Sequence, residues 1–250
     1  MIKLGNYEVD KIYNEDCYES IKKIPTNSID LVIIDPPYLI DQHGCGGCFG
    51  RERQKFHNEV ATLSNGIDLN ILDELVRVMK KINIYIFCNK NQLFDYLRYF
   101  RNKNCSVDLL TWHKLHPIPT CNNKYLSDTE YILFFREKGV QLYGTYHSKK
   151  KYFITEKNIK DKRKYGHPTP KPIEIIKTLI INSSKEGDLV ADFFIGSGTT
   201  AVASKQLNRK FIGFENNSIY FNNAIERIKK ECDNHEMETL LQLCKNKTIS

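Results

Sequence analysis

Strand-sized apolar runs alternate with helical patterns along this chain, and this alternation constrains its fold more than any other feature. The runs are rich in β-branched and aromatic residues and lie at 29–34, 84–88, 107–112, 131–135, 189–194 and 210–214. Patterns with helical spacing lie between several of them, at 69–80, 92–101, 173–182, 199–207 and 219–230. Strands that are joined through helices run parallel in one sheet, so the sequence predicts an α/β fold.

One pair of runs departs from this rule. The runs at 107–112 and 131–135 have no helical pattern between them. Two strands joined without a helix can close as an antiparallel hairpin, which an otherwise parallel sheet accepts at its edge. We therefore expect a mostly parallel sheet with an antiparallel hairpin at one edge.

The size and composition of the chain narrow its class. At 250 residues it can bury one good core, and we expect a single domain over 1–250. Its apolar runs are far shorter than the roughly 20 residues of a membrane span. Residues 1–10 lack the apolar stretch of a secretory signal, and the eight cysteines are interpreted as reduced thiols, so we expect a cytoplasmic protein. The net charge of +7 weakly favours a polyanionic partner.

Two polar stretches interrupt the alternation. Residues 41–66 form a long segment rich in glycine and charge, and we expect a mobile loop that closes over the substrate. Cys45 and Cys48 within it have zinc-like spacing, with His43 and His57 nearby, but no second cysteine pair follows at finger distance, so no metal is expected. Residues 136–166 carry ten Lys or Arg against three acids, an excess equal to the +7 of the whole chain.

The run at 189–194 leads into a Gly-rich turn and then a helical pattern. Gly196, Gly198 and Ala201 match the dinucleotide fingerprint, and Glu215 follows Gly196 by 19 residues, at the end of the next run. Glycines let the backbone approach a ligand, and an acid at this place can bind ribose hydroxyls. No Lys-Ser or Lys-Thr follows, which excludes a P-loop. The pattern fits NAD and S-adenosylmethionine alike, and a purely structural turn is the plain alternative.

Asp35-Pro36-Pro37-Tyr38 ends the run at 29–34, because two consecutive prolines cannot continue a strand ladder. In an open α/β sheet, ligands bind at the carboxyl ends of strands. The exocyclic amine of adenine or cytosine is a poor nucleophile, and the Asp35 carboxylate and Pro36 carbonyl could accept hydrogen bonds from its N–H groups. Tyr38 offers a ring on which an extruded base can stack. A structural proline turn is the alternative.

Together these motifs resemble the β-class amino-methyltransferases of DNA, in which the Asp-Pro-Pro-Tyr motif precedes the Gly-rich loop. The resemblance covers nearly the whole chain and implies S-adenosylmethionine as the cofactor. It implies a circularly permuted Rossmann-like fold, with a mostly parallel seven-stranded sheet and an antiparallel edge hairpin. An NAD enzyme has no reason to carry Asp-Pro-Pro-Tyr at the adjoining strand end, so the two motifs together favour a methyltransferase over an NAD-dependent oxidoreductase.

The resemblance also implies roles for individual residues. The expected catalytic residues are Asp35, Pro36, Pro37 and Tyr38. The expected cofactor-binding residues are Asp16, Cys17, Asp35, His167, Thr169, Lys171, Asp192, Phe194, Gly196, Ser197, Gly198, Thr199, Thr200, Glu215 and Asn216. Trp112, Lys114, Thr129 and Glu130 resemble the family's paired edge strands. Phe193 stands where the family commonly has proline and Pro170 where glutamine is frequent, and neither position supplies the chemistry.

In this family the segment at about 137–166 would read the DNA target. The side chains expected to contact phosphates are Lys149, Lys150, Lys151, Lys162, Arg163 and Lys164. A solvated basic loop is the alternative for this segment. Double-stranded DNA is the expected partner, and a homodimer and a cognate restriction endonuclease are candidate partners.

The expected activity is site-specific methylation of adenine N6 in duplex DNA after base flipping. Cytosine N4, or an amine of RNA or protein, is the alternative acceptor. Asp35 favours adenine, because cytosine-N4 relatives more often carry serine at this place. A non-catalytic DNA-binding protein is a further alternative.

Overall fold

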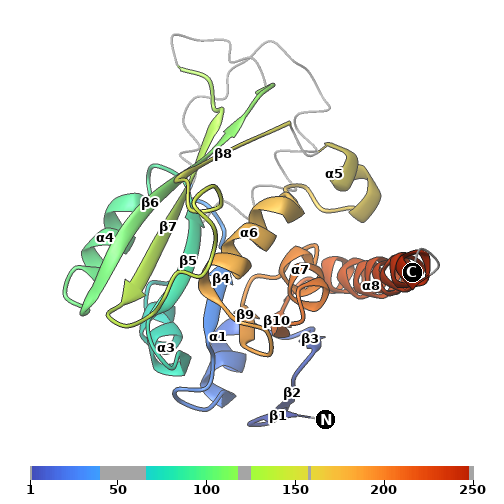
Figure 1. Ribbon diagram of the computed structural model, residues 1–250. Coiled ribbons are helices and arrows are strands. Elements are labelled where there is room, and N and C mark those ends of the chain that lie inside the picture. Colours follow the sequence, from blue (N-terminus) through green and yellow to red (C-terminus); the bar gives the residue numbers. More distant parts are fainter. Residues whose placement is uncertain (1, 40–65, 118–124, 157–158, 248–250) are drawn as a thin grey trace.

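The computed structural model describes residues 2–39, 66–117, 125–156 and 159–247, which surround one central sheet (Figure 1). The sheet has eight strands in the order β3-β10-β9-β4-β5-β7-β6-β8. Their bounds in that order are Lys11–Tyr13, Lys210–Phe214, Leu189–Asp192, Leu31–Ile34, Asn83–Cys88, Thr129–Glu137, Cys105–Lys114 and Tyr152–Thr155. A separate pair, β1 (Lys3–Leu4) and β2 (Tyr7–Glu8), is antiparallel.

The mostly parallel sheet predicted from the sequence is confirmed. Strands β3, β10, β9, β4 and β5 pair in parallel, and β7 pairs antiparallel with both β5 and β6. The predicted hairpin is therefore present as β6 and β7. It is not the edge itself, because β8 pairs in parallel with β6 from Thr111 against Tyr152 to Lys114 against Thr155. Strand β8 makes eight strands where seven were expected.

Helices cover both faces of the sheet because its central strands are apolar on both faces. In β4, Val32 and Ile34 join one core cluster and Leu31 and Ile33 join another. The first cluster includes side chains of α3 (Ile71–Val78) and α4 (Leu93–Phe100), and the second includes those of α6 (Ile173–Ser183). Figure 1 shows these helices on opposite sides of the sheet. This double burial explains the unbroken apolar runs.

The remaining helices lie around this core. Their bounds are Cys17–Ser20 for α1, Ile21–Lys23 for the 3₁₀ helix η1, Ile159–Tyr165 for α5, Thr199–Gln206 for α7 and Ser218–Lys247 for α8. Ala224 of α8 packs in a third cluster with Ile12, Ala201 and Phe211. In the part of the chain that the structure describes, no helix combines the length and the apolar character needed to cross a bilayer.

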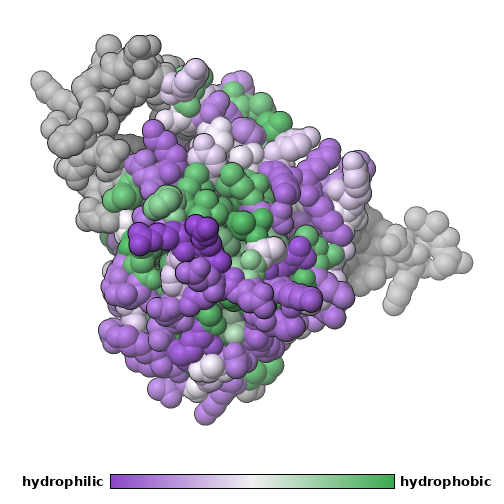
Figure 2. Space-filling model, turned by 90° about the vertical axis from the view of Figure 1, so that its left-hand side faces the viewer, coloured by the Kyte–Doolittle hydropathy of each residue, from purple (hydrophilic) through white to green (hydrophobic). Residues whose placement is uncertain are grey.

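Helices leave part of the sheet uncovered on the side that carries α4 and β6. Phe94 and Leu97 of α4 and Val107 and Leu109 of β6 are exposed apolar side chains. Figure 2 shows hydrophobic side chains gathered on this face of the molecule. The hairpin is therefore less enclosed than the centre of the sheet.

The chain leaves the two central strands, β4 and β9, toward opposite edges of the sheet. From β4 the chain proceeds to β5 on one side, and from β9 it proceeds to β10 on the other. Adjacent strands that lead away from each other leave a crevice beyond their carboxyl ends, which is where open α/β sheets bind ligands. Asp35 follows β4 and Asp192 ends β9, so both motifs meet at this crevice although they are far apart in sequence.

Candidate active site

The two carboxylate oxygens of Asp35 have different surroundings. Oδ2 lies 2.5 Å from the ammonium of Lys171, in a salt bridge. Oδ1 is buried and has no hydrogen-bond partner among the residues that the structure describes. Burial raises the pKa of Asp35, and the Lys171 ammonium acts against that shift. A buried acceptor without a partner is costly unless a ligand supplies the donor, so Oδ1 is a candidate contact for a substrate N–H.

The Asp-Pro-Pro-Tyr backbone is held by side chains that follow β5. Gln92 Nε2 donates to the Pro37 carbonyl at 3.0 Å. Asn89 Nδ2 donates to the Leu39 carbonyl at 2.7 Å, and Asn91 Nδ2 does so at 3.2 Å. These bonds fix the turn after β4 against the start of α4.

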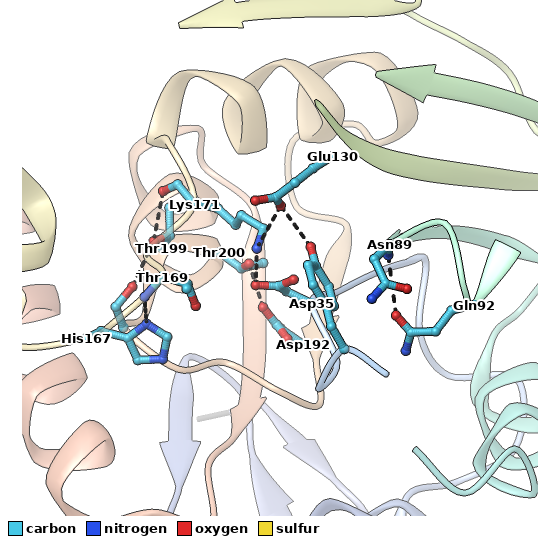
Figure 3. Close-up of polar contacts among 12 residues, drawn as sticks. Asp35, Asn89, Gln92, Glu130, His167, Thr169, Lys171, Asp192, Thr199 and Thr200 are labelled. Carbon is cyan, nitrogen blue, oxygen red and sulfur yellow. Dashed lines mark hydrogen bonds and ion pairs between the residues drawn. The ribbon is translucent and has the colours of Figure 1, made fainter. Parts of the chain in front are cut away.

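Glu130 at the start of β7 lies between two ammonium groups and a phenol. Figure 3 shows its contact with the Lys171 ammonium. The Tyr38 hydroxyl donates to Oε2 at 2.8 Å, and Lys171 Nζ lies 3.4 Å from the same oxygen. Lys114 Nζ of β6 lies 2.5 Å from Oε1. Burial opposes ionisation of Glu130, but the charges of Lys171 and Lys114 lower its pKa to about 2. Glu130 therefore carries a negative charge at neutral pH.

The Gly-rich loop requires its glycines. Gly196 and Gly198 have φ of 49° and 76°, in the left-handed region that favours glycine. A Cβ on Gly196 would lie 2.8 Å from His167 Nε2, and one on Gly198 would lie 3.0 Å from the Ala224 Cβ. The loop thus passes too close to its neighbours to accept side chains at these two positions.

Two acids hold the loop from either side, buried Asp192 and partly buried Glu215. Asp192 accepts hydrogen bonds from the Thr200 hydroxyl at 2.6 Å and the Phe194 N–H at 3.0 Å. Burial raises the pKa of Asp192 to about 7. Glu215 accepts from the backbone N–H groups of Gly196 and Asn217, each at 2.9 Å. Burial raises the pKa of Glu215, and these backbone donors oppose the shift.

The segment before α6 lies against this loop. His167 contacts Gly196 and accepts a hydrogen bond at Nδ1 from the Thr169 N–H at 3.3 Å. Burial and the charges of Lys171 and Arg227 lower the pKa of His167 to about 4, so the imidazole is neutral at physiological pH. The Lys171 carbonyl accepts from the Thr199 hydroxyl at 3.5 Å.

The N-terminal segment that contains the predicted cofactor-binding residues Asp16 and Cys17 reaches the end of β10. Asn14 Nδ2 donates to the Glu215 carbonyl at 2.7 Å. Asp16 caps α1 by accepting from the Tyr18 N–H at 2.7 Å, and Cys17 follows it as a buried side chain. Burial, then the charges of Asp16 and Glu215, raise the pKa of Cys17 to about 12. Asn216 is exposed beside Glu215.

The predicted phosphate-binding residues lie in two groups, one before β8 and one in α5. Lys151 precedes β8 and pairs with Asp108, and Lys164 of α5 pairs with Glu231 of α8 at 2.9 Å. These ion pairs involve exposed lysine side chains and contribute about 0–1 kcal/mol each, so phosphate could replace them. Lys149, Lys150 and Arg163 are exposed, and Lys162 is partly buried.

The strand registers bring the second half of the basic segment, residues 136–166, to the crevice. Tyr131 of β7 opposes Cys88, so β7 begins at the carboxyl end of β5. The end of β6 pairs with the start of β7, and β8 runs parallel to β6. Strand β8 therefore ends at the same edge as Asp35, and α5 follows from there.

No motif in the sequence marks Arg227 of α8, which the structure places at the loop. Its Nη1 donates to the Thr199 hydroxyl at 2.8 Å and to the Ser197 carbonyl and hydroxyl at 3.2 Å. Its guanidinium lies 4.0 Å from the ring centroid of Tyr165 in α5. Arg227 therefore connects the Gly-rich loop to the basic segment. Residues 41–65, with Cys45, Cys48, His43 and His57, lie outside the described residues.

A family model described as DNA methylase, N6_N4_Mtase, matches residues 29–226. The chain belongs to this DNA methylase family. The match includes both motifs and the basic segment between them. Membership in the DNA methylase family confirms the resemblance and removes the NAD-dependent oxidoreductase from consideration.

Two proteins to which the chain is similar are both described as Type II methyltransferases. It is 29% identical over 240 residues to the Type II methyltransferase M2.LlaDCHI of Lactococcus lactis subsp. cremoris, covering 88% of this chain and 89% of that one. It is 28% identical over 262 residues to M.HinfI of Haemophilus influenzae, covering 94% and 72%.

Two solved structures share the fold of this DNA methylase. The M1.HpyAVI–SAM complex aligns with a TM-score of 0.66 and 25% identity, covering 87% of this chain and 98% of that one. The cytosine-N4-specific PvuII DNA methyltransferase aligns with the same TM-score of 0.66 at 15% identity, covering 90% and 92%. At 15% identity the second likeness concerns the fold alone.

Proposed function

We propose that this member of the DNA methylase family is a site-specific methyltransferase that modifies adenine N6 in duplex DNA after base flipping. The observation that carries the proposal is the asymmetry of Asp35, whose Oδ2 is held by Lys171. Its Oδ1 is buried without a partner from the described part of the chain, at the crevice that the Gly-rich loop borders.

S-adenosylmethionine supplies the methyl group on a sulfonium centre. The Gly-rich loop fits such a cofactor because Gly196 and Gly198 let the backbone come close to it. Glu215 can accept ribose hydroxyls, because each carboxylate oxygen has a lone pair beyond the backbone bond that it accepts. We assign binding of the cofactor's adenine to Asp16, Cys17 and Asn216. We assign its other contacts to the predicted residues of the Gly-rich loop and of 167–171.

The chain's own residues position the acceptor amine. Asp35 Oδ1 accepts a hydrogen bond from one N–H, and the Pro36 carbonyl accepts from the other. The Tyr38 ring stacks on the extruded base, and its hydroxyl bond to Glu130 fixes the ring's orientation. Holding an amine in line with the methyl group supplies much of the rate acceleration.

Adenine is favoured over cytosine by the residue at position 35. The chain carries aspartate where cytosine-N4 relatives more often carry serine. Cytosine N4 in DNA and an amine of RNA are the alternative acceptors, and nucleoside analysis separates them.

The basic segment supports DNA as the substrate. Residues 136–166 carry the excess charge, and the part of this segment that follows β8 lies at the edge of the sheet that holds Asp35. We assign target recognition to this segment and phosphate contacts to its lysines and Arg163. The relatives named Type II methyltransferases support a restriction-modification role, with a cognate endonuclease as a functional partner.

The test is methyl transfer from labelled S-adenosylmethionine to unmethylated duplex DNA, followed by nucleoside analysis. We expect labelled N6-methyladenine with the wild type and a loss of at least about 100-fold with Asp35→Asn. The matched control Asp73→Asn changes an exposed acid on α3 and keeps wild-type activity. Labelled N4-methylcytosine would transfer the assignment to the cytosine alternative. Label in RNA alone would overturn DNA as the substrate.

A further inference from the structure

Four buried or half-buried charges form one chain of alternating sign beside the methyl-transfer site. Asp35 contacts Lys171, Lys171 also contacts Glu130, and Glu130 contacts Lys114. The exposed fractions of the four side chains are 23%, 7%, 15% and 23% in the order Asp35, Lys171, Glu130 and Lys114. Lys171 is the most buried of them and the one that contacts both acids.

A cluster of buried ion pairs is not required for the stability of the fold. Desolvating an ion pair costs about as much as the pair returns, and apolar side chains of similar volume often serve a core equally well. The cluster also includes the groups that are proposed to contact the target base. One end is Asp35, and a branch from Glu130 holds the hydroxyl of Tyr38.

Lys171 is tied to the cofactor loop as well. Its carbonyl accepts from the Thr199 hydroxyl, and His167 of the same segment contacts Gly196. Its ammonium lies 5.3 Å from the ring centroid of Tyr38 and 5.2 Å from that of Phe87. The resemblance placed Lys171 among the cofactor ligands, but its ammonium points to the acids instead (Figure 3).

We propose that Lys171 is a positioning residue for the acceptor amine: it fixes Asp35 Oδ2 so that Oδ1 faces the amine, and Glu130 fixes Lys171 and Tyr38 together. This inference rests on the proposed function of the same site. It gives the 167–172 segment a second task, because the residue that borders the cofactor loop also sets the orientation and charge of Asp35.

Several titratable groups surround Asp35. They are Lys171 before α6, Glu130 on β7, Tyr38 on its own turn, Cys88 on β5, Tyr96 on α4 and Asp192 on β9. Lys114 of β6 acts on Glu130, and Lys171 acts on His167 beside the loop. Lys171 favours the ionised form of Asp35, whereas Glu130 disfavours it. Removing these two charges should therefore shift the titration of Asp35 in opposite directions.

The first test uses the folded protein alone, without cofactor or DNA. The side-chain carboxyl carbon of Asp35 is followed by NMR in ¹³C-aspartate-labelled protein and assigned by its loss in Asp35→Asn. We expect Lys171→Met to move the Asp35 titration to higher pH and Glu130→Gln to move it to lower pH. Lys185→Met changes an exposed lysine that precedes β9, at the opposite end of the strands, and leaves the titration unchanged.

Shifts in the same direction, or no shift, in the Lys171 and Glu130 variants would overturn the inference. Thermal melting of each variant shows that it is folded before titration. If Lys171→Met does not fold, the isosteric Glu130→Gln variant carries the test alone, and a titration of Asp35 that stays in place or rises contradicts the proposal.

The second test measures methyl transfer by the same variants. We expect Lys171→Met to lower kcat by about 10- to 100-fold, with little change in the KM for either substrate and with the acid limb of the kcat profile at higher pH. A loss confined to KM would contradict a positioning role. If the wild type itself transfers no methyl group, the proposed function fails, whereas the NMR titrations still decide whether Lys171 controls Asp35.

Discussion

At Tyr38 the ring and the hydroxyl have separate partners, and the two can be tested apart. The hydroxyl donates to Glu130. We expect Tyr38→Phe to keep the stacking surface and lose only the fixed ring orientation. Tyr38→Ala removes the ring, and base–aromatic stacking contributes about 1–3 kcal/mol per base. The fluorescence of 2-aminopurine at the target position should therefore show base flipping that is nearly normal for Phe and strongly reduced for Ala. Equal losses in both variants would contradict the stacking role.

Asp192 predicts a pH dependence of stability. Its pKa is raised from 3.8 to about 7 by burial, so the folded state binds its proton more tightly than the unfolded state does. The stability that this proton contributes is fully present below pH 3.8 and is lost as the pH rises through about 7. Asp192→Asn lacks this titration, and the Thr200 hydroxyl can turn to accept from the new amide.

The measurement is the free energy of unfolding of both proteins between pH 5 and 8. We expect Asp192→Asn to gain stability relative to the wild type as the pH rises, by a few kcal/mol over the window. A difference that is constant with pH would show that the Asp192 pKa is not raised.

Among the elements, α8 has the clearest role beyond packing. Arg227 is buried and donates to Ser197 and Thr199, at the point where the Gly-rich loop becomes α7. Arg227→Met leaves these acceptors without that donor, at a cost of about 1–3 kcal/mol. We expect a lower Tm and weaker binding of S-adenosylmethionine in calorimetry. Lys229→Met, an exposed change on the same helix, should alter neither. Unchanged cofactor affinity in Arg227→Met would contradict the role of Arg227 at the loop.

The elements differ in how well the sequence predicts them. Strands β4 and β5 and helices α3, α4 and α6 follow from apolar periodicity because their buried faces are continuous. Strand β8 is not predicted from the sequence, because its Tyr-Phe-Ile-Thr run is short, half-exposed and preceded by lysines. Only its pairing with β6 makes it a strand.

The candidate site shows the same division. Asp35 and the glycines carry local signals, since prolines end a strand and glycines permit positive φ. Glu130 lies just before the apolar run at 131–135, and the sequence assigns it only to an edge strand, with no sign of a role at the site. Its place depends on the antiparallel register of β7 with β5, which brings the start of β7 to the carboxyl end of the parallel strands. Arg227 likewise depends on how α8 packs against the loop.

For the whole molecule, the distribution of charge predicts how DNA binds. The lysines around β8 and α5 supply the excess positive charge of the chain, and phosphate contacts release counterions. We expect neutralising Lys149, Lys150 and Lys162 to weaken binding to all DNA sequences alike. The slope of log affinity against log salt should fall by about one for each phosphate-binding lysine that is neutralised. Neutralising Lys3, Lys22 and Lys185, which lie elsewhere on the surface, provides the matched control. An unchanged salt slope would show that the basic segment does not bind phosphates.

The most direct test of the central claim maps modified bases in genomic DNA from a host that lacks adenine methylation of its own. The chain is expressed as the wild type and as Asp35→Asn. We predict N6-methyladenine at every copy of one short sequence with the wild type and at none with Asp35→Asn. N4-methylcytosine at the modified sites, or full modification by Asp35→Asn, would contradict the account.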